Sequence, residues 1–234
     1  MIWAVELGNT RTKVSFVKAE DANAVETQFF APDDFSWLDA IDPNAPIRVA
    51  NTARRNLPPA LLGHQVTLDA PWPFTLACAP TIGVDRCLAA LGARQLHPKG
   101  PLAVISCGTC LTGTLLDGNN FLKGGPISPG WSMRLKAMAH FAPALPALEP
   151  VKRPFYPSGS VSTAEGMHEG AYAGMQAEID HWIAGWQQEF AGIAVFITGG
   201  DGPAFAKPYE SGIFAASNLE ALGLLAQYLY ETHP

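Results

Sequence analysis

Charged side chains are scarce in this sequence: Asp, Glu, Lys and Arg together make up 15% of its 234 residues. The chain has no run of Lys or Arg and a net charge of −6, so neither nucleic acid nor an anionic membrane is expected as its main partner. No apolar run approaches the roughly 20 residues that cross a bilayer. The first residues have neither the basic nor the long apolar region of a signal peptide. We therefore expect a cytoplasmic protein.

Cysteine is also rare. Of the four cysteines, Cys107 and Cys110 form a C-x-x-C pair. A redox pair of this kind opens a helix, and a zinc site needs two further ligands close by. Here the pair runs into a strand-like segment at residues 111–116, and the six histidines show no metal-binding spacing. The pattern favours small residues in a tight loop over a redox or zinc site.

The best-known phosphate-binding patterns are missing, because neither G-x-x-x-x-G-K-[ST] nor G-x-G-x-x-G occurs. Instead, Gly8-Asn9-Thr10 and Gly108-Thr109 each separate two strand-like segments. Glycine lets the main chain approach a ligand closely, and inward-facing N–H groups make a nest for an anion. One such turn is typical of an ordinary hairpin. Two of them, with Gly199-Gly200-Asp201 after a third strand, favour a nucleotide site.

Apolar residues, at 48%, are numerous enough for a sizeable core, and their spacing predicts an α/β chain. Strands are predicted at residues 2–5, 13–17, 47–50, 65–68, 102–105, 111–116 and 193–197. Helices are predicted at residues 58–62, from residue 84, from Ser128-Pro129 to before Pro143, and after the capping-box patterns Ser162-x-x-Glu165 and Ser217-x-x-Glu220. Pro98-Lys-Gly-Pro101 marks the expected hinge between two halves, residues 1–98 and 99–234, whose openings are similar.

Asp85 is the most informative carboxylate. Apolar residues at helical spacing from Val84 to Leu91 put Asp85 and Arg86 in the first turn of a helix. The helix dipole stabilises a carboxylate there, which is one reason for its presence. The alternative is a base that takes a proton from an attacking hydroxyl, with Arg86 holding an anionic substrate by a bidentate contact. Arg11 and Lys13, beside the first turn, either meet phosphate oxygens or are ordinary solvated charges.

Taken together, these motifs resemble the type III pantothenate kinases, a branch of the superfamily of actin, acetate kinase and the sugar kinases. The resemblance runs nearly end to end and in order. It is carried by Glu6-Leu-Gly-Asn-Thr-Arg-Thr-Lys13 (D-x-G-N-T in the family), Gly83-Val-Asp-Arg86 (G-x-D-R), Ser106-Cys-Gly-Thr-Cys-Leu-Thr-Gly-Thr114 (D-x-G-T-x-x-T-x-D), Gly124-Gly-Pro-Ile-Ser-Pro-Gly130 (G-G-x-I-x-P-G) and Thr198-Gly-Gly-Asp201 (T-G-G-D). G-x-D-R and G-G-x-I-x-P-G are specific in this combination, whereas G-N-T alone is not.

The resemblance implies an α/β fold of two RNase H-like (actin-like ATPase) halves, with mixed sheets flanked by helices and ATP in the cleft between the halves. It implies a kinase that transfers the γ-phosphoryl group of ATP to the hydroxyl of pantothenate, the first step of coenzyme A biosynthesis. The implied cofactors are ATP, Mg²⁺ and a monovalent cation, K⁺ or NH₄⁺. The implied assembly is a homodimer, which agrees with the low charge content.

The same resemblance assigns roles to individual residues. Asp85 would be the catalytic base. The pantothenate contacts would be Gly83, Val84, Asp85, Arg86 and Thr163. The ATP contacts would be Glu6, Leu7, Gly8, Asn9, Thr10, Arg11, Thr12, Lys13 and Thr109. Glu6 and Ser106 stand at the positions of the family's metal-binding carboxylates.

Four features depart from the family's pattern. Glu6 replaces the family's first Asp, and Ser106 replaces its cation-binding Asp. Thr114 replaces the Asp that closes the second phosphate motif. The usual tyrosine before the G-x-D-R helix is missing from residues 76–79. The lost carboxylates predict weaker handling of metal ions and leave two alternatives open. One is a weakened or non-catalytic relative that acts by binding a nucleotide or a protein, and the other is a kinase for another small acidic alcohol.

Overall fold

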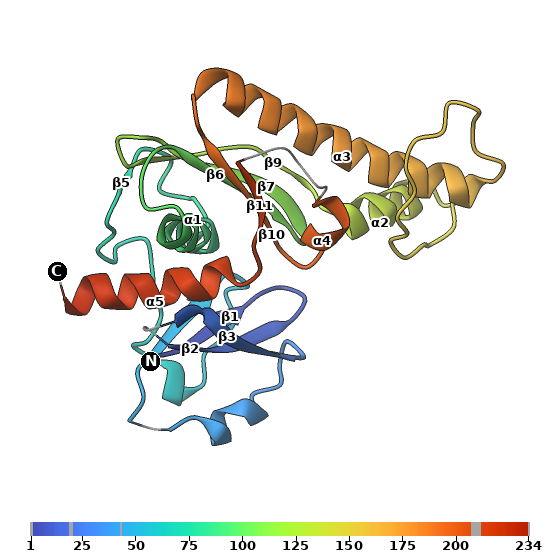
Figure 1. Ribbon diagram of the computed structural model, residues 1–234. Coiled ribbons are helices and arrows are strands. Elements are labelled where there is room, and N and C mark those ends of the chain that lie inside the picture. Colours follow the sequence, from blue (N-terminus) through green and yellow to red (C-terminus); the bar gives the residue numbers. More distant parts are fainter. Residues whose placement is uncertain (1, 19–20, 43, 207–211, 234) are drawn as a thin grey trace. The chain divides into compact units, whose positions relative to one another are not determined.

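The computed structural model describes residues 2–18, 21–42, 44–206 and 212–233 (Figure 1). The chain forms two compact units. The first contains Met1–Leu102, Thr114–Gly124 and Ser217–Pro234, and the second contains Ala103–Gly113 and Gly125–Ala216. Whether residues 1–98 and 99–234 are the two halves of a duplicated fold stays a prediction.

The first unit is built on a four-stranded sheet of order β3-β2-β1-β4. Its strands are β1 (Ile2–Leu7), β2 (Thr12–Lys18), β3 (Asp21–Phe30) and β4 (Ile47–Asn51). β2 is antiparallel to both β1 and β3, whereas β1 and β4 are parallel. The predicted strand–turn–strand opening of the chain is therefore confirmed, with Gly8, Asn9 and Thr10 in the turn.

Two long helices of this unit lie side by side, α1 (Val84–Leu96) and α5 (Leu219–Thr232) (Figure 1). Their main chains approach closely at two glycines. A methyl group added to Gly92 would collide with the main chain of Leu219, and one added to Gly223 would collide with that of Leu88. The lack of a side chain at these two positions therefore sets the distance between the helices.

The alternation of side chains along β1 divides the core of this unit in two. Ile2 and Ala4 pack with apolar residues of α1 and α5. Val5 and Leu7 point to the opposite face, where they pack with residues of the short 3₁₀ helices η1 (Ser36–Ala40) and η2 (Pro59–Leu61). Glu6 follows Ala4 by two residues and therefore leaves the sheet on the face that α5 covers.

The other sheet has the strand order β11-β10-β6-β7-β8-β5, and β9 pairs with β7 beside that path. Its strands are β5 (Thr75–Leu76), β6 (Leu102–Cys107), β7 (Cys110–Leu116), β8 (Phe121–Gly124), β9 (Ile127–Pro129), β10 (Ala194–Thr198) and β11 (Ile213–Ala215). β7 is antiparallel to β8 and β9, whereas β10 is parallel to β11. The predicted α/β class, with two mixed sheets flanked by helices, is confirmed.

The second unit has the helices α2 (Trp131–Phe141), α3 (Thr163–Glu189) and α4 (Gly202–Phe205). α2 packs against α3. The predicted capping box before α3 is confirmed, because the N–H of Glu165 donates to the hydroxyl of Ser162 at 3.2 Å. The carboxylate of Glu165 in turn accepts a hydrogen bond from the N–H of Val161 at 3.0 Å.

Several local predictions are wrong. Ser128-Pro129 belongs to β9, and α2 begins at Trp131 after the N-cap Gly130. Ser217-x-x-Glu220 is not a capping box, because the N-cap of α5 is Asn218, whose side chain caps nothing. Residues 65–68 form no strand and contribute only a bridge between Gln65 and Val49. β3 was not predicted, since its first residues, Asp-Ala-Asn-Ala, have low strand propensity.

Within the described ranges of the chain, every helix is too short or too polar to cross a membrane.

Candidate active site

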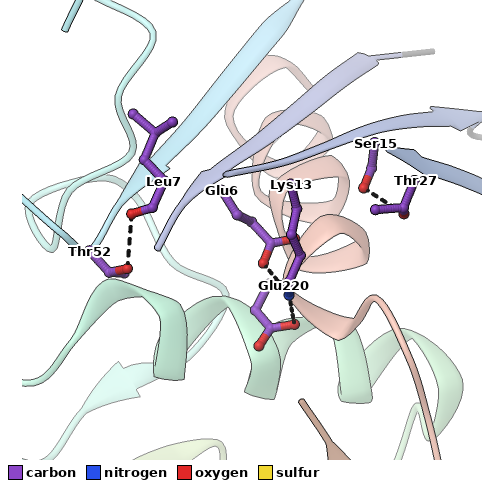
Figure 2. A network of polar contacts seen from close by, with 7 residues as sticks. All are labelled: Glu6, Leu7, Lys13, Ser15, Thr27, Thr52 and Glu220. Atoms are coloured by element: carbon purple, nitrogen blue, oxygen red, sulfur yellow. Dashed lines mark hydrogen bonds and ion pairs between the residues drawn. The ribbon is translucent and has the colours of Figure 1, made fainter. Parts of the chain in front are cut away.

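The turn between β1 and β2 is flanked by opposite charges. Glu6 and Lys13 face each other across the antiparallel strands, so their side chains leave the sheet on the same side. The ammonium nitrogen Nζ of Lys13 lies 2.7 Å from Oε2 of Glu6 and 3.8 Å from Oε2 of Glu220 (Figure 2). Glu220 is in the first turn of α5. One ammonium group therefore lies between two carboxylates from distant parts of the sequence.

These charges are largely shielded from water, because the side chains of Glu6 and Glu220 are 12% and 11% exposed. Burial and the charge of Glu220 raise the pKa of Glu6 to about 7, against the opposing effect of Lys13. Burial opposes a charge on Lys13, but Glu220 and Glu6 outweigh it and raise the pKa of Lys13. When both carboxylates are ionised, the cluster has an excess of negative charge that favours a further cation or a proton.

The sequence analysis did not predict Glu220 as a residue of the candidate active site. Its Oε2 is buried and accepts no hydrogen bond, and it faces the ammonium of Lys13. The available signal was a lone acidic residue in the first turn of a very apolar helix, Leu-Glu-Ala-Leu-Gly-Leu-Leu-Ala. Glutamate is seldom buried without a partner, so such a position indicates a distant cation.

Arg55 holds the main chain of the same turn, and the sequence analysis missed it too. Its guanidinium donates to the carbonyl oxygens of Gly8 and Pro32 and, at 3.0 Å, to the hydroxyl of Thr12. Asn51 fixes Arg55 in turn: its Oδ1 accepts from the N–H of Arg55 at 2.9 Å, and its Nδ2 donates to the carbonyl of Arg55 at 2.8 Å. No motif in the sequence marks this arrangement.

The remaining residues of the first motif differ in exposure. Leu7 and Thr12 are fully buried in the first unit, so neither side chain is accessible to a ligand. The carbonyl of Leu7 accepts from the hydroxyl of Thr52 at 3.2 Å (Figure 2). Asn9, Thr10 and Arg11 are exposed at the tip of the turn. These exposed residues are the ones whose side chains are accessible to a ligand.

Asp85 is the second residue of α1, in the first turn after the N-cap Gly83. A methyl group added to Gly83 would collide with the carboxylate of Asp85, so glycine lets this carboxylate fold back over the start of the helix. Burial and the charge of Glu220 raise the pKa of Asp85, although the N–H group and the charge of Arg86 oppose the rise. A raised pKa makes a carboxylate a better proton acceptor, as a general base requires.

Arg86 follows Asp85 in the same helical turn and is 9% exposed. Burial lowers the pKa of Arg86, and the neighbouring charge of Asp85 opposes that effect. Its Nε donates a hydrogen bond of 3.0 Å to the hydroxyl Oγ1 of Thr114 on β7. Val84, also predicted to contact the substrate, packs against the apolar core beneath α5.

The second glycine turn, between β6 and β7, is held by main-chain packing. The N–H of Gly130 donates to the carbonyl of Thr109 at 3.2 Å. A methyl group added to Gly130 would collide with the carbonyl oxygen of Gly108. One added to Gly199, whose φ is 92°, would collide with the main chain of Cys107. Two motif glycines therefore let other segments approach this turn.

The predicted site residues are divided between the two compact units. Those of the first unit include the charged residues Glu6, Lys13, Asp85 and Arg86. Those of the second unit are neutral: Ser106, Thr109 and Thr163. Thr163, the first residue of α3, and Thr109 are exposed, whereas Ser106 is half-buried at the end of β6. The roles of all these residues toward ligands stay predictions.

Metal binding can be tested against the side chains present. Among the described residues, no three His, Cys, Asp or Glu side chains lie close enough together to hold a metal ion. Mg²⁺ at a nucleotide site needs less, because one or two carboxylates hold it together with phosphate and water oxygens. Glu6 is the carboxylate beside the first turn, and it would have to give up part of its contact with Lys13 to hold the ion. Ser106 fits a monovalent cation poorly, since it offers one neutral oxygen.

Comparison with solved structures defines the class of fold. The structure resembles that of a candidate 2-dehydro-3-deoxygalactonokinase from Sinorhizobium meliloti with a TM-score of 0.59, at 14% identity, over 98% of this chain and 99% of that one. At this identity the likeness shows the fold alone. The chain therefore has the fold of the sugar kinases and related ATPases, as predicted.

Sequence comparison narrows the class to a family. The model of the family described as type III pantothenate kinase matches residues 43–185. A type III pantothenate kinase of Flavobacterium psychrophilum is 32% identical over 97% of this chain and 99% of its own length. That of Cytophaga hutchinsonii is 38% identical over 62% of this chain and 60% of its own length. The chain belongs to the type III pantothenate kinase family.

Proposed function

We propose that this protein phosphorylates pantothenate with ATP to give 4′-phosphopantothenate, the first step of coenzyme A biosynthesis, in the cytoplasm. Membership of the family supports the substrate. The single structural observation that carries the proposal is Asp85, a carboxylate of raised pKa in the first turn of α1 with Arg86 beside it. This is the pairing that an acidic substrate with a reactive hydroxyl requires, since one group accepts a proton and the other attracts an anion.

In the proposed reaction, the hydroxyl oxygen of pantothenate attacks the γ-phosphorus of ATP. A new O–P bond forms, the bond from the γ-phosphorus to the bridging oxygen breaks, and ADP leaves with that electron pair. Asp85 accepts the hydroxyl proton as the new bond forms. Phosphoryl transfer depends mainly on position and charge stabilisation, so the protein contributes chiefly by orienting the hydroxyl and the phosphates.

The first turn is the proposed phosphate site. The N–H groups near Gly8 and the ammonium of Lys13 would bind phosphate oxygens. Arg55 holds the turn in place through its hydrogen bonds to Gly8 and Thr12. Lys13 would then exchange part of its contact with Glu6 and Glu220 for phosphate. Mg²⁺ supplies charge neutralisation on the phosphates when bound, and Glu6 is the carboxylate proposed to hold it.

An ATP-consumption assay tests the proposal directly. ADP formation is measured with pantothenate, with buffer alone and with other small hydroxy acids, each in the presence of Mg²⁺ and of K⁺, NH₄⁺ or neither. We expect turnover that depends on pantothenate. No pantothenate-dependent turnover under any cation would refute the function and leave the weakened or non-catalytic relative. Faster turnover with another hydroxy acid would reassign the substrate.

The proposed assembly is a homodimer. Large apolar side chains are exposed on the second unit, among them Phe141 at 82%, Phe155 at 68% and Val161 at 92%. Exposed aromatic and aliphatic groups of this size are typical of a surface that another chain covers. Light scattering at micromolar concentration should give the mass of two chains, and Phe141→Glu should shift it toward one. A monomeric wild-type protein would contradict the proposal.

A further inference from the structure

The hydroxyl of Thr114 is the acceptor of a buried hydrogen bond that no part of the proposed mechanism uses. Oγ1 of Thr114 accepts from Nε of Arg86 at 3.0 Å. Thr114 is 2% exposed, Arg86 is 9% exposed, and both belong to the first compact unit. Removing the acceptor of a buried charged donor is expensive, because the donor has no water to replace it. This hydroxyl is therefore one of the groups that orient the guanidinium.

The choice of Nε matters for what the guanidinium can bind. Guanidinium carries five N–H groups in a rigid plane, and an end-on bidentate contact with a carboxylate uses Nη1 and Nη2. An anchor on Nε is compatible with that contact and fixes the plane in which it forms. Asp85, the proposed base, is the residue before Arg86 in the same helical turn. The charges of these two side chains act on each other's pKa, so an anion on Arg86 would lie within electrostatic reach of the base.

The chemical type of the anchor also matters. The family's pattern has Asp where this chain has Thr114. A carboxylate there would both orient the guanidinium and neutralise its charge, whereas a hydroxyl orients it without adding a negative charge. The positive charge of Arg86 is thus retained for an anionic substrate group.

We propose that Thr114 is a positioning residue for substrate recognition: its hydroxyl holds the guanidinium of Arg86 in the orientation that receives the carboxylate of the acceptor substrate. The inference rests on the proposed function, since it takes the acceptor to be pantothenate. It adds a specific expectation. The loss of the hydroxyl should weaken recognition of the carboxylate and leave recognition of the hydroxyl end unchanged.

Calorimetric titration of the full chain tests this with two ligands, pantothenate and pantothenol, in which a hydroxymethyl group replaces the carboxylate. In Thr114→Val the hydroxyl becomes a methyl group of nearly the same size. We expect pantothenate affinity to fall about tenfold and pantothenol affinity to stay within about twofold, as one lost hydrogen bond to a charged group predicts. Thr114→Ser, which keeps the hydroxyl, should restore pantothenate binding. In steady-state assays the KM for pantothenate should rise while the KM for ATP stays the same.

A matched control is Thr27→Val, which removes a hydroxyl from β3 in the same unit, where it shares a 2.8 Å hydrogen bond with Ser15. This variant should leave the affinities for pantothenate and pantothenol unchanged. If Thr114→Val does not fold, Thr114→Cys supplies a weak acceptor in the same place and should show the same selective loss. Equal weakening of both ligands, or no weakening of either, would overturn the inference. A wild type that binds no pantothenate would instead refute the proposed function, and the inference with it.

Discussion

The two glycine turns have similar sequences but are held in different ways. Around the first turn, side chains provide the support: Arg55 binds the carbonyl of Gly8, and Lys13 lies between Glu6 and Glu220. Around the second, main chain packs on main chain at Gly130 and Gly199. The first turn is therefore supported by charged side chains, whose interactions a ligand, a proton or a substitution can change. The second turn is supported by the close packing of main chain. Ser106 and Thr114, where the family's pattern has Asp, leave the second motif with fewer charged side chains than the first.

The largest effect is expected where charge carries the chemistry. Asp85→Asn keeps the size of the side chain but removes its ability to accept a proton. Turnover should fall by about 10²–10⁴, while ATP binding measured by calorimetry should stay nearly unchanged. Asp39→Asn, in η1 of the same unit, is the matched control and should keep full activity. A variant Asp85→Asn with wild-type turnover would reduce Asp85 to a charge at the end of a helix.

The packing of the second turn should respond to a single methyl group. Gly199→Ala meets the main chain of Cys107 and must keep a φ of 92°, which disfavours any side chain. We expect it to lower the free energy of unfolding by about 1–3 kcal/mol in urea titrations. The control Gly185→Ala lies in α3 with open space around it and should be slightly stabilising. If both variants are as stable as the wild type, the second turn is not held by close main-chain packing.

The charge cluster of the first turn should make stability depend on pH. The pKa of Glu6 is raised from 4.5 to about 7, so the folded protein binds this proton more tightly than the unfolded chain. The resulting stabilisation is fully present below pH 4.5 and is lost as the pH rises through 7. We expect the wild type to lose on the order of 1–3 kcal/mol relative to Glu6→Gln over this window, measured by urea unfolding from pH 4.5 to 8.

Glu26→Gln, an exposed position on β3, is the control for that series and should follow the wild type at every pH. A constant difference in stability between Glu6→Gln and the wild type would mean that Glu6 keeps its charge across the range, and that Lys13 compensates for its burial.

The smallest effect concerns the monovalent cation. A hydroxyl attracts a hard cation far less than a carboxylate does, so Ser106 should make the activity only weakly dependent on potassium. Ser106→Asp should increase the stimulation. A potassium titration at constant ionic strength, with choline chloride as the balancing salt, measures both. A wild type that is inactive without potassium would show that another oxygen, such as a main-chain carbonyl, fills the place of the lost carboxylate.

Local patterns were enough to predict the parts of the molecule that depend on neighbours in the sequence. The strand–turn–strand opening and the start of α1 at Val84 follow from alternation, helical spacing and turn glycines. The capping box at Ser162 is local too, and it was correct. The similar pattern at Ser217 failed because α5 begins one residue later than that pattern requires, with Asn218 as its N-cap, and Glu220 instead faces the distant Lys13.

The rest depended on contacts between distant segments. Arg55 reaches Gly8 from beyond β4, and nothing in the residues around it signals that contact. Ser128-Pro129 resembles a helix start but pairs with β7 as part of β9, because tertiary pairing overrides local preference. The hydrogen bond between Thr114 and Arg86 was hidden for the same reason, although both residues stood in motifs that the sequence analysis had marked.

The most direct test of the account is to follow the phosphoryl group itself. Phosphorus NMR of the protein with ATP, Mg²⁺ and pantothenate resolves the γ-phosphate, inorganic phosphate and a phosphomonoester. The account predicts that a phosphomonoester of pantothenate grows in proportion to the loss of the γ-phosphate, and that Asp85→Asn abolishes this growth. Release of inorganic phosphate alone, or no change in the γ-phosphate, would contradict it.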